Sequence, residues 1–199
     1  MGLGAFTPWR GRRIVVFDLE YTAWPGAMER NWSGPGELRE IIQIGAVKAE
    51  VTTGMAEIGC FSMVVRPARN PLLSDYITAL TGITQAQVDD QGVPFAQALA
   101  AFLAFVGDDS TTEVCSNGSD DLRLYENCRL YDLPEAPLAA LRFRNLRPWL
   151  TARLGPGAVL ESCRLLENFG PSAGQPLHDG LGDARIILET LRRLGCASM

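Results

Sequence analysis

The sequence lacks the histidine and cysteine patterns from which zinc knuckles and disulfide frameworks are built. Its 199 residues include a single histidine, and its five cysteines include no pair with Cys-x-x-Cys spacing. An odd number of cysteines without such a pair argues against a disulfide framework and against a zinc knuckle. We therefore expect a reducing, cytoplasmic setting for the protein.

Long apolar runs and an excess of basic residues are also missing. No apolar run approaches the roughly 18 residues of a membrane-spanning helix, so no membrane contact is expected. Residues 1–13 lack the apolar core of a signal peptide. The net charge of -5 disfavours binding to long nucleic-acid duplexes, but does not exclude a short strand end held through metal ions. Local basic clusters at residues 10–13 and 142–147 are equally well interpreted as solvated faces.

The chain does contain enough apolar sequence for one sizeable core, with 47% hydrophobic and 21% charged residues. Strands predicted at 14–19, 41–47 and 59–66, with a turn at 51–55, indicate an antiparallel meander. The segments that follow alternate between strand and helix. Strands are predicted at 113–116 and 141–146, helices at 84–88, 94–106, 120–129 and 147–154, and amphipathic segments at 160–169 and 182–194.

No linker, repeat or low-complexity segment interrupts this order. We therefore expect a single α/β domain with a mixed sheet over residues 1–199. Its core is expected at about 13–194, with residues 1–12 as an N-terminal arm.

The strongest functional signal is the segment 14–20, where an apolar strand runs into Asp18 and Glu20. Side chains alternate along a strand, so these two carboxylates point to the same face. Like charges held together repel and raise each other's pKa, and a bound divalent cation relieves that cost. The pair therefore predicts a metal site at the edge of a buried sheet.

A second acidic segment follows the predicted strand at 113–116 and contains Asp120 and Asp121. Loops that leave a strand and open into a helix are where α/β proteins place their ligands. Taken alone, Asp121 is equally a solvated surface acid.

A third segment, near the C-terminus, contains the only histidine, His178, and an acid five residues later, Asp183. Glycines at positions 180 and 182 disfavour helix there. We therefore expect His178 in the loop or first turn, with Asp179 as the N-cap and Asp183 in the first turn of the last helix. Taken alone, His178 is more often a surface or packed residue, and Asp183 a charge that the helix dipole favours.

Together these segments resemble the DEDDh family of 3′–5′ exonucleases, within the ribonuclease H-like superfamily. The resemblance covers roughly residues 13–194 and points to the branch of small RNA-processing exonucleases. It rests on Phe17-Asp18-Leu19-Glu20 as D-x-E, Gly118-Ser119-Asp120-Asp121 as the third-acid segment, His178 to Asp183 as H-x(4)-D, the strand at 39–47, and Leu80-Thr81-Gly82-Ile83-Thr84.

The resemblance implies a ribonuclease H-like fold, in which helices flank a central five-stranded mixed sheet. It also implies two divalent cations, Mg²⁺ or Mn²⁺, at a site where Asp18 is shared between them. Asp18, Glu20, Asp183 and Asp121 would be the ligands. The third acid is ambiguous by one residue, and the usual G-x-x-D spacing favours Asp121 over its neighbour Asp120.

His178 would act as general base and take a proton from the attacking water, a role that an unperturbed pKa of about 6.5 suits. The implied reaction removes the last nucleotide of a single-stranded nucleic acid, RNA favoured over DNA, and releases a nucleoside 5′-monophosphate. The alternatives are a non-cleaving nucleic-acid-binding protein of the same fold and a phosphohydrolase that acts on dinucleotides.

An apolar slot for the terminal base is also expected. Tyr21, Thr22 and Ala23 directly follow the first motif and form one predicted wall, while Leu80 and Thr81 form the other. The loop at 21–39 is long for the family, and its tryptophans have no assigned role. The sequence is compatible with a monomer and with a homodimer.

Overall fold

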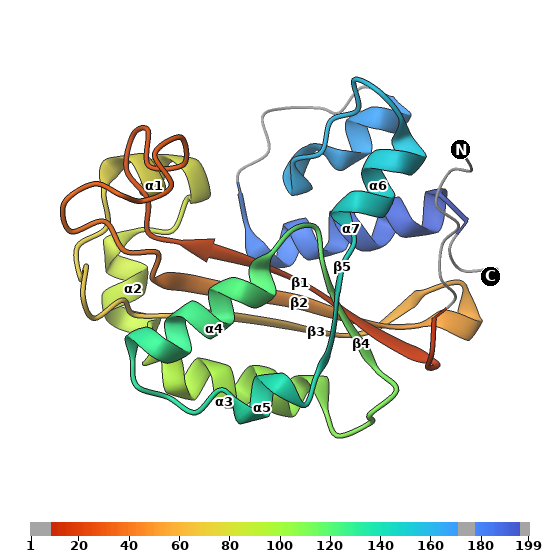
Figure 1. The fold of residues 1–199 in the computed structure, drawn as a ribbon, viewed down its shortest axis with the longest axis horizontal. Coiled ribbons are helices and arrows are strands. Elements are labelled where there is room, and N and C mark those ends of the chain that lie inside the picture. The colour runs from red at the N-terminus through yellow and green to blue at the C-terminus, as the bar shows by residue number, and fades with distance from the viewer. Residues whose placement is uncertain (1–8, 171–177, 196–199) are drawn as a thin grey trace.

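The computed structural model describes residues 9–170 and 178–195 of the chain. A five-stranded sheet in the order β3-β2-β1-β4-β5 forms its centre (Figure 1). The strands are β1 (Arg13–Tyr21), β2 (Ile41–Glu50), β3 (Ala56–Val64), β4 (Glu113–Ser116) and β5 (Arg142–Asn145).

The first three strands form the antiparallel meander that the sequence predicts, and β4 and β5 add in parallel beside β1. The mixed α/β sheet is therefore confirmed. The β1–β4 register pairs Val16 with Cys115, so the chain that leaves β4 at Asn117 lies beside Asp18. Two segments far apart in the sequence thus reach the same edge of the sheet.

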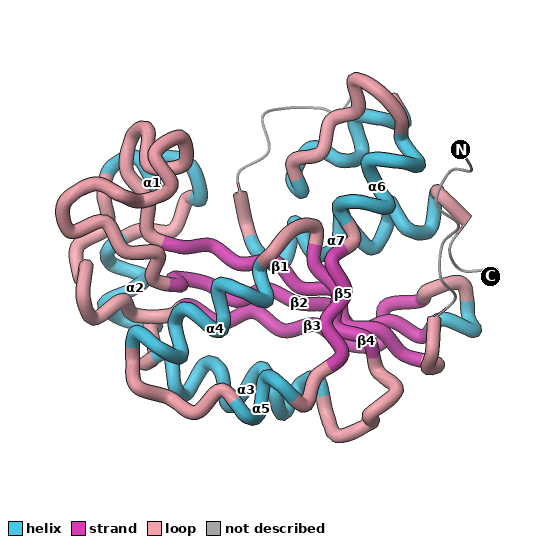
Figure 2. The backbone as a smooth tube through the Cα atoms, in the orientation of Figure 1, coloured by secondary structure: helices cyan, strands magenta, loops and turns pink. Residues whose placement is uncertain are grey.

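Helices cover both faces of the sheet, as the tube in Figure 2 shows. No helix within the described ranges is both long and apolar enough to cross a membrane. The helices are α1 (Asp75–Thr81), α2 (Gln85–Gln91), α3 (Phe95–Val106), α4 (Asp120–Leu130), α5 (Ala136–Ala139), α6 (Arg147–Leu154) and α7 (Gly180–Arg193), with 3₁₀ helices η1 (Val51–Thr53) and η2 (Ser162–Phe169).

Strand β1 divides the core because its side chains alternate between the two faces. Ile14 and Val16 belong to the apolar cluster that includes α7, whereas Val15 and Phe17 belong to the cluster that includes α3. All four side chains are fully buried. The row that faces α7 continues into the two acids of the first motif.

Several local elements differ from the sequence prediction, among them the short helix α5, which was not predicted. Helix α1 was not predicted; it starts at the N-cap Ser74, whose side chain accepts a hydrogen bond from the backbone N–H of Ile77. The amphipathic segment at 160–169 forms the tighter 3₁₀ helix η2. By contrast, Thr84 caps α2 as expected, through a capping box with Gln87.

The long loop between β1 and β2 packs against α1 and α2 rather than standing free. Ala23, Ala27 and Ile42 share an apolar cluster with Ile77 of α1 and Val88 of α2. Such packing fixes the loop as a wall at one end of the sheet.

Candidate active site

Asp18 and Glu20 extend the buried row of β1 that faces α7. Their side chains are almost fully withdrawn from solvent, at 8% and 6% exposure. Burial of two carboxylates on one strand face is costly unless something compensates their charge. One oxygen of Glu20, Oε1, is buried without any hydrogen-bond partner.

The N-terminus of α7 brings a third carboxylate to the pair. Asp179 caps the helix and accepts a hydrogen bond from the backbone N–H of Gly182 at 3.0 Å, as predicted. Asp183 follows in the first turn, with its side chain 3% exposed. Oxygens of Asp18, Glu20 and Asp183 all lie within 4.8 Å of one another. Such a set of hard oxygen ligands suits a divalent cation.

Strand β2 fixes the position of this helix N-terminus. Gln43 donates through Nε2 to Asp179 at 2.9 Å and accepts through Oε1 from the backbone N–H of Gly180 at 2.8 Å. Beside it, Gly45 leaves room for the helix backbone, since a Cβ there would lie 2.0 Å from the carbonyl carbon of Gly180. These contacts align Asp183 with the acids of β1.

The fourth carboxylate comes from α4, and the structure favours Asp120 rather than Asp121. Asp120 lines the same cavity as Asp18 and Glu20, and Asp121 is absent from the lining. Adjacent helical residues point about 100° apart, so only one of the two can face the cavity. The G-x-x-D spacing favours Asp121. In the structure, however, α4 begins at Asp120, and it is this residue of the first turn that lines the cavity.

Burial and neighbouring carboxylates raise the proton affinity of all four acids. Burial, followed by repulsion from Asp120, Asp183 and Glu20, raises the pKa of Asp18 well above its usual value. Burial, followed by repulsion from Asp183, raises the pKa of Glu20 to about 9. Burial also raises the pKa of Asp120 and of Asp183 to about 7 in each case. A cluster of this kind gains stability from a bound cation.

His178 lies at the mouth of this cluster, just before α7. Its backbone N–H donates to the carbonyl of Leu80 at 3.1 Å. Its Nδ1 is 4.0 Å from Oδ2 of Asp183, and its side chain is 34% exposed. Burial lowers its pKa, so the imidazole is neutral at pH 7 and able to accept a proton.

A cavity of about 490 Å³ joins these residues to an apolar wall. Of the predicted base-binding residues, Tyr21, Ala23 and Leu80 line it. Thr22 and Thr81 do not; both are buried, and their hydroxyls donate to the backbone carbonyls of Leu38 and Ile77. These two threonines therefore hold the surrounding loops in place.

Other cavity residues were missed by the sequence analysis. Met28 and Tyr76 stand exposed at the wall, and Trp32 packs edge-on against Tyr21. Arg147 also faces the cavity, held by two hydrogen bonds to the carbonyl of Asn117. A local sequence pattern carries no signal for them, because they reach the site from the long loop between β1 and β2, from α1 and from α6.

The basic clusters noted in the sequence separate in the structure. Arg144 forms an ion pair with Glu113, and Arg12 one with Glu50, so both serve the scaffold. Within the described ranges, Arg147 is the only arginine of these clusters that lines the cavity.

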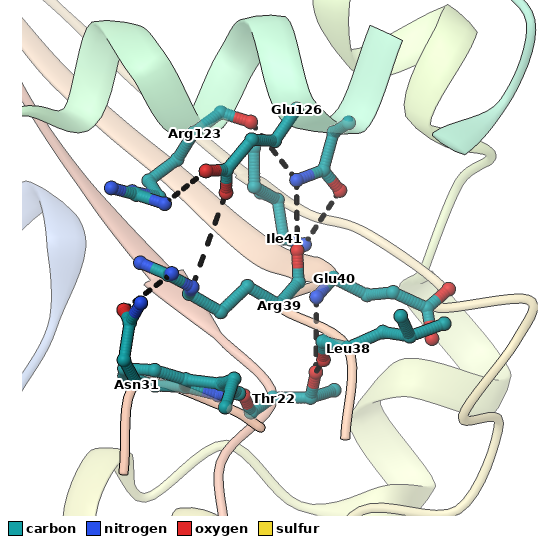
Figure 3. A network of polar contacts seen from close by, with 10 residues as sticks. Thr22, Asn31, Leu38, Arg39, Glu40, Ile41, Arg123 and Glu126 are labelled. Carbon is teal, nitrogen blue, oxygen red and sulfur yellow. Dashed lines mark hydrogen bonds and ion pairs between the residues drawn. The ribbon is translucent and has the colours of Figure 1, made fainter. Parts of the chain in front are cut away.

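A polar network links the long loop between β1 and β2 to α4 (Figure 3). The side chain of Asn127 in α4 accepts from the backbone N–H of Ile41 at 3.0 Å and donates to the carbonyl of Arg39 at 2.9 Å. Arg39 donates to Asn31 at 2.8 Å and lies over the ring of Trp32. The network ties the long loop, the start of β2 and α4 together.

The mixed sheet, with buried acids from β1 and α7 and a partly buried acid from α4 beside a single histidine, defines a nuclease-type site on a ribonuclease H-like fold. A family model described as Exonuclease matches residues 15–191, and the chain belongs to that family. Among solved structures, the nuclease domain of 3′hExo, a DEDDh family member bound to rAMP, aligns with a TM-score of 0.75 at 25% identity and covers 96% of each chain.

Sequence relatives agree with this placement. The chain is 28% identical over 200 residues to 3′-5′ exoribonuclease 1 from Homo sapiens. This alignment covers 92% of this chain and 53% of that protein. It is 38% identical over 93 residues to ERI1 exoribonuclease 2 from Xenopus laevis. This alignment covers 47% of this chain and 12% of that protein. The chain thus spans about half, or less, of the length of these relatives.

The residues present fit the divalent cations that the family implies. Three carboxylates converge within 4.8 Å, and Glu20 Oε1 is a buried oxygen without a partner, as a ligand atom would be before its ion binds. All the donors are hard oxygens, the type that Mg²⁺ and Mn²⁺ prefer.

Proposed function

We propose that the chain is a 3′–5′ exonuclease that hydrolyses the terminal phosphodiester of single-stranded nucleic acid, RNA in preference to DNA. The convergence of three buried carboxylates, the partly buried Asp120 and the only histidine on one cavity supports this most strongly. The names of the relatives, two of them exoribonucleases, support RNA as the substrate class.

Asp18, Glu20, Asp183 and Asp120 would hold two divalent cations, Mg²⁺ or Mn²⁺, with Asp18 shared between them. When bound, the cations supply charge stabilisation for the phosphodiester and activate the attacking water. His178 takes the proton of that water, because its neutral imidazole borders the acids and is open to the cavity.

The rest of the cavity holds the strand end. Leu80 and Ile77 offer an apolar wall for the terminal base, and Tyr76 and Met28 extend it at the rim. Base stacking on such a surface tolerates any sequence. Arg147 of α6 lines the same cavity and would contact a phosphate, which gives local positive charge to a net-acidic chain.

Incubation of the protein with a labelled single strand, a duplex and a dinucleotide, each with Mn²⁺ or with EDTA, tests this proposal. We expect metal-dependent shortening of the single strand above all. Binding without shortening would favour the non-cleaving alternative, and cleavage of the dinucleotide alone would favour the small phosphohydrolase.

A further inference from the structure

A thiol lies directly against the histidine of the site. Cys163, in η2, is 6% exposed, and its Sγ is 3.6 Å from Nε2 of His178. The second ring nitrogen, Nδ1, lies 4.0 Å from Oδ2 of Asp183. One donor atom each from Cys163, His178 and Asp183 lies within 4.8 Å of the others.

This second set of donors differs in chemistry from the four acids. Sulfur and imidazole nitrogen suit Zn²⁺ better than Mg²⁺ or Mn²⁺, which prefer oxygen. In a tetrahedral site, Zn–S of about 2.3 Å and Zn–N of about 2.0 Å place sulfur and nitrogen about 3.5 Å apart. The observed Sγ–Nε2 distance of 3.6 Å matches that spacing before any ion binds.

The surroundings favour a cation and provide access for it. Carboxylates of Asp183, Asp18 and Glu161 lie near the thiol. His178 and Asp183 border the cavity, which leaves room for a water as fourth ligand. Burial keeps the thiol protonated without a metal, which argues against a redox-active cysteine.

We propose that Cys163, His178 and Asp183 form a zinc site that switches off the nuclease site. Asp183 belongs to both donor sets, and His178 is the base of the proposed reaction. A zinc ion bound to these three residues would keep Asp183 from holding the catalytic cations and His178 from accepting the proton of the attacking water. The inhibitory half of this proposal rests on the proposed function, whereas zinc binding itself does not.

Titration with Co²⁺, a spectroscopic substitute for Zn²⁺, tests the binding directly. A sulfur-to-cobalt charge-transfer band should appear in the wild-type protein and in Cys60→Ser, which removes an exposed cysteine of β3. The band should be absent in Cys163→Ser, with the fold checked by circular dichroism. A band that persists in Cys163→Ser, or no band in the wild type, would overturn the site.

Nuclease assays in saturating Mg²⁺ with increasing Zn²⁺ test the inhibition, with each variant compared to its own zinc-free rate. Cys163→Ser should need about tenfold more zinc, or more, for half-inhibition than the wild type or Cys60→Ser. Equal inhibition of all three would place zinc on the acids alone and overturn the switch. A chain without nuclease activity would sink the proposed function, while the cobalt titration would still decide the site.

Discussion

At the scale of single residues, the site depends on which of two adjacent acids faces the cavity. Asp120 borders the cavity with Asp18, whereas Asp121 does not line it. Both occupy the first turn of α4, where a negative charge has a similar effect on helix stability. Substitution of either removes the same charge from the same turn, so the pair forms a matched test.

We expect Asp120→Asn to lower kcat by about 100-fold or more, since it removes a proposed ligand of the cations that would stabilise the charge of the transition state. Asp121→Asn should keep kcat within about threefold, because Asp121 does not line the cavity. Steady-state kinetics on a single-stranded RNA would measure both. The opposite ranking would restore Asp121 as the third acid.

His178 carries the second residue-scale prediction. His178→Ala should lower kcat by about 100-fold to 10,000-fold, the usual worth of a general base. The variant should keep the fold and the affinity for Mn²⁺, because the acids of β1 and α7 stay in place. Calorimetric titration with Mn²⁺ and a kcat measurement would check this, and unchanged turnover would remove the base assignment.

At the scale of elements, the close approach of α7 to β2 aligns the acids. A Cβ at Gly45 would meet the backbone of Gly180 and Leu181 at 2.0 Å, which no side-chain movement relieves. A Cβ at Gly59, in β3, would meet only the ring of Phe105 at 3.6 Å, an ordinary contact. Alanine substitutions at these two glycines therefore distinguish the loss of the α7–β2 contact from the general effect of placing alanine in a strand.

Gly45→Ala should destabilise the protein by about 3 kcal/mol or more, the upper range for overpacking, and should lower activity as α7 shifts. Gly59→Ala should change stability by about 1 kcal/mol or less, with activity kept. Urea unfolding and turnover of the soluble variants would check this. Equal effects of both substitutions would show that the α7 approach does not set the site.

The elements that the sequence predicted well are those with strong local signals. Strand β4 and helix α6 have the predicted bounds, and Asp179 caps α7 as expected. The amphipathic pattern begins only at residue 182, whereas α7 begins at Gly180, directly after its N-cap, where contacts with Gln43 and Gly45 of β2 offset the low helix propensity of glycine. Such long-range contacts leave no mark in the local sequence.

The same limit applies to the site. The motif acids and His178 could be named from sequence, since each lies at the end of an apolar element. The choice of Asp120 depends on the rotation of one helix turn, and the positions of Arg147 and Tyr76 depend on how the distant helices α6 and α1 pack around the cavity. The cytoplasmic setting, the single-domain organisation and the state of assembly stay predictions.

At the scale of the whole molecule, the buried acids link stability to pH and to metal. Unfolded carboxyl groups have a pKa of about 4, whereas in the folded chain the pKa of Glu20 is raised to about 9 and those of Asp120 and Asp183 to about 7. Between these values the folded state keeps protons that the unfolded chain has lost. The free energy of unfolding of the metal-free protein should therefore fall as pH rises from about 4 to about 9.

Divalent cations bind the ionised acids, so Mg²⁺ or Mn²⁺ should remove most of that fall. In EDTA, Glu20→Gln should make the fall of the free energy of unfolding with pH shallower. It should also raise stability near pH 9 by about 1 kcal/mol or more, which corresponds to about 2–4 °C in melting temperature. Thermal melts with EDTA or with Mg²⁺ would measure this. Stability that rises with pH in EDTA would contradict the account of the acid cluster.

The central claim is that this acid cluster, with His178, removes single nucleotides from a 3′ end. Its most direct test is a single-turnover reaction on a 3′-end-labelled single-stranded RNA with Mg²⁺, with the labelled product identified by chromatography. A nucleoside 5′-monophosphate as the first labelled product, lost in EDTA and in Asp18→Asn, is the predicted result. Labelled oligonucleotide fragments, or release that persists without metal or in Asp18→Asn, would contradict the claim.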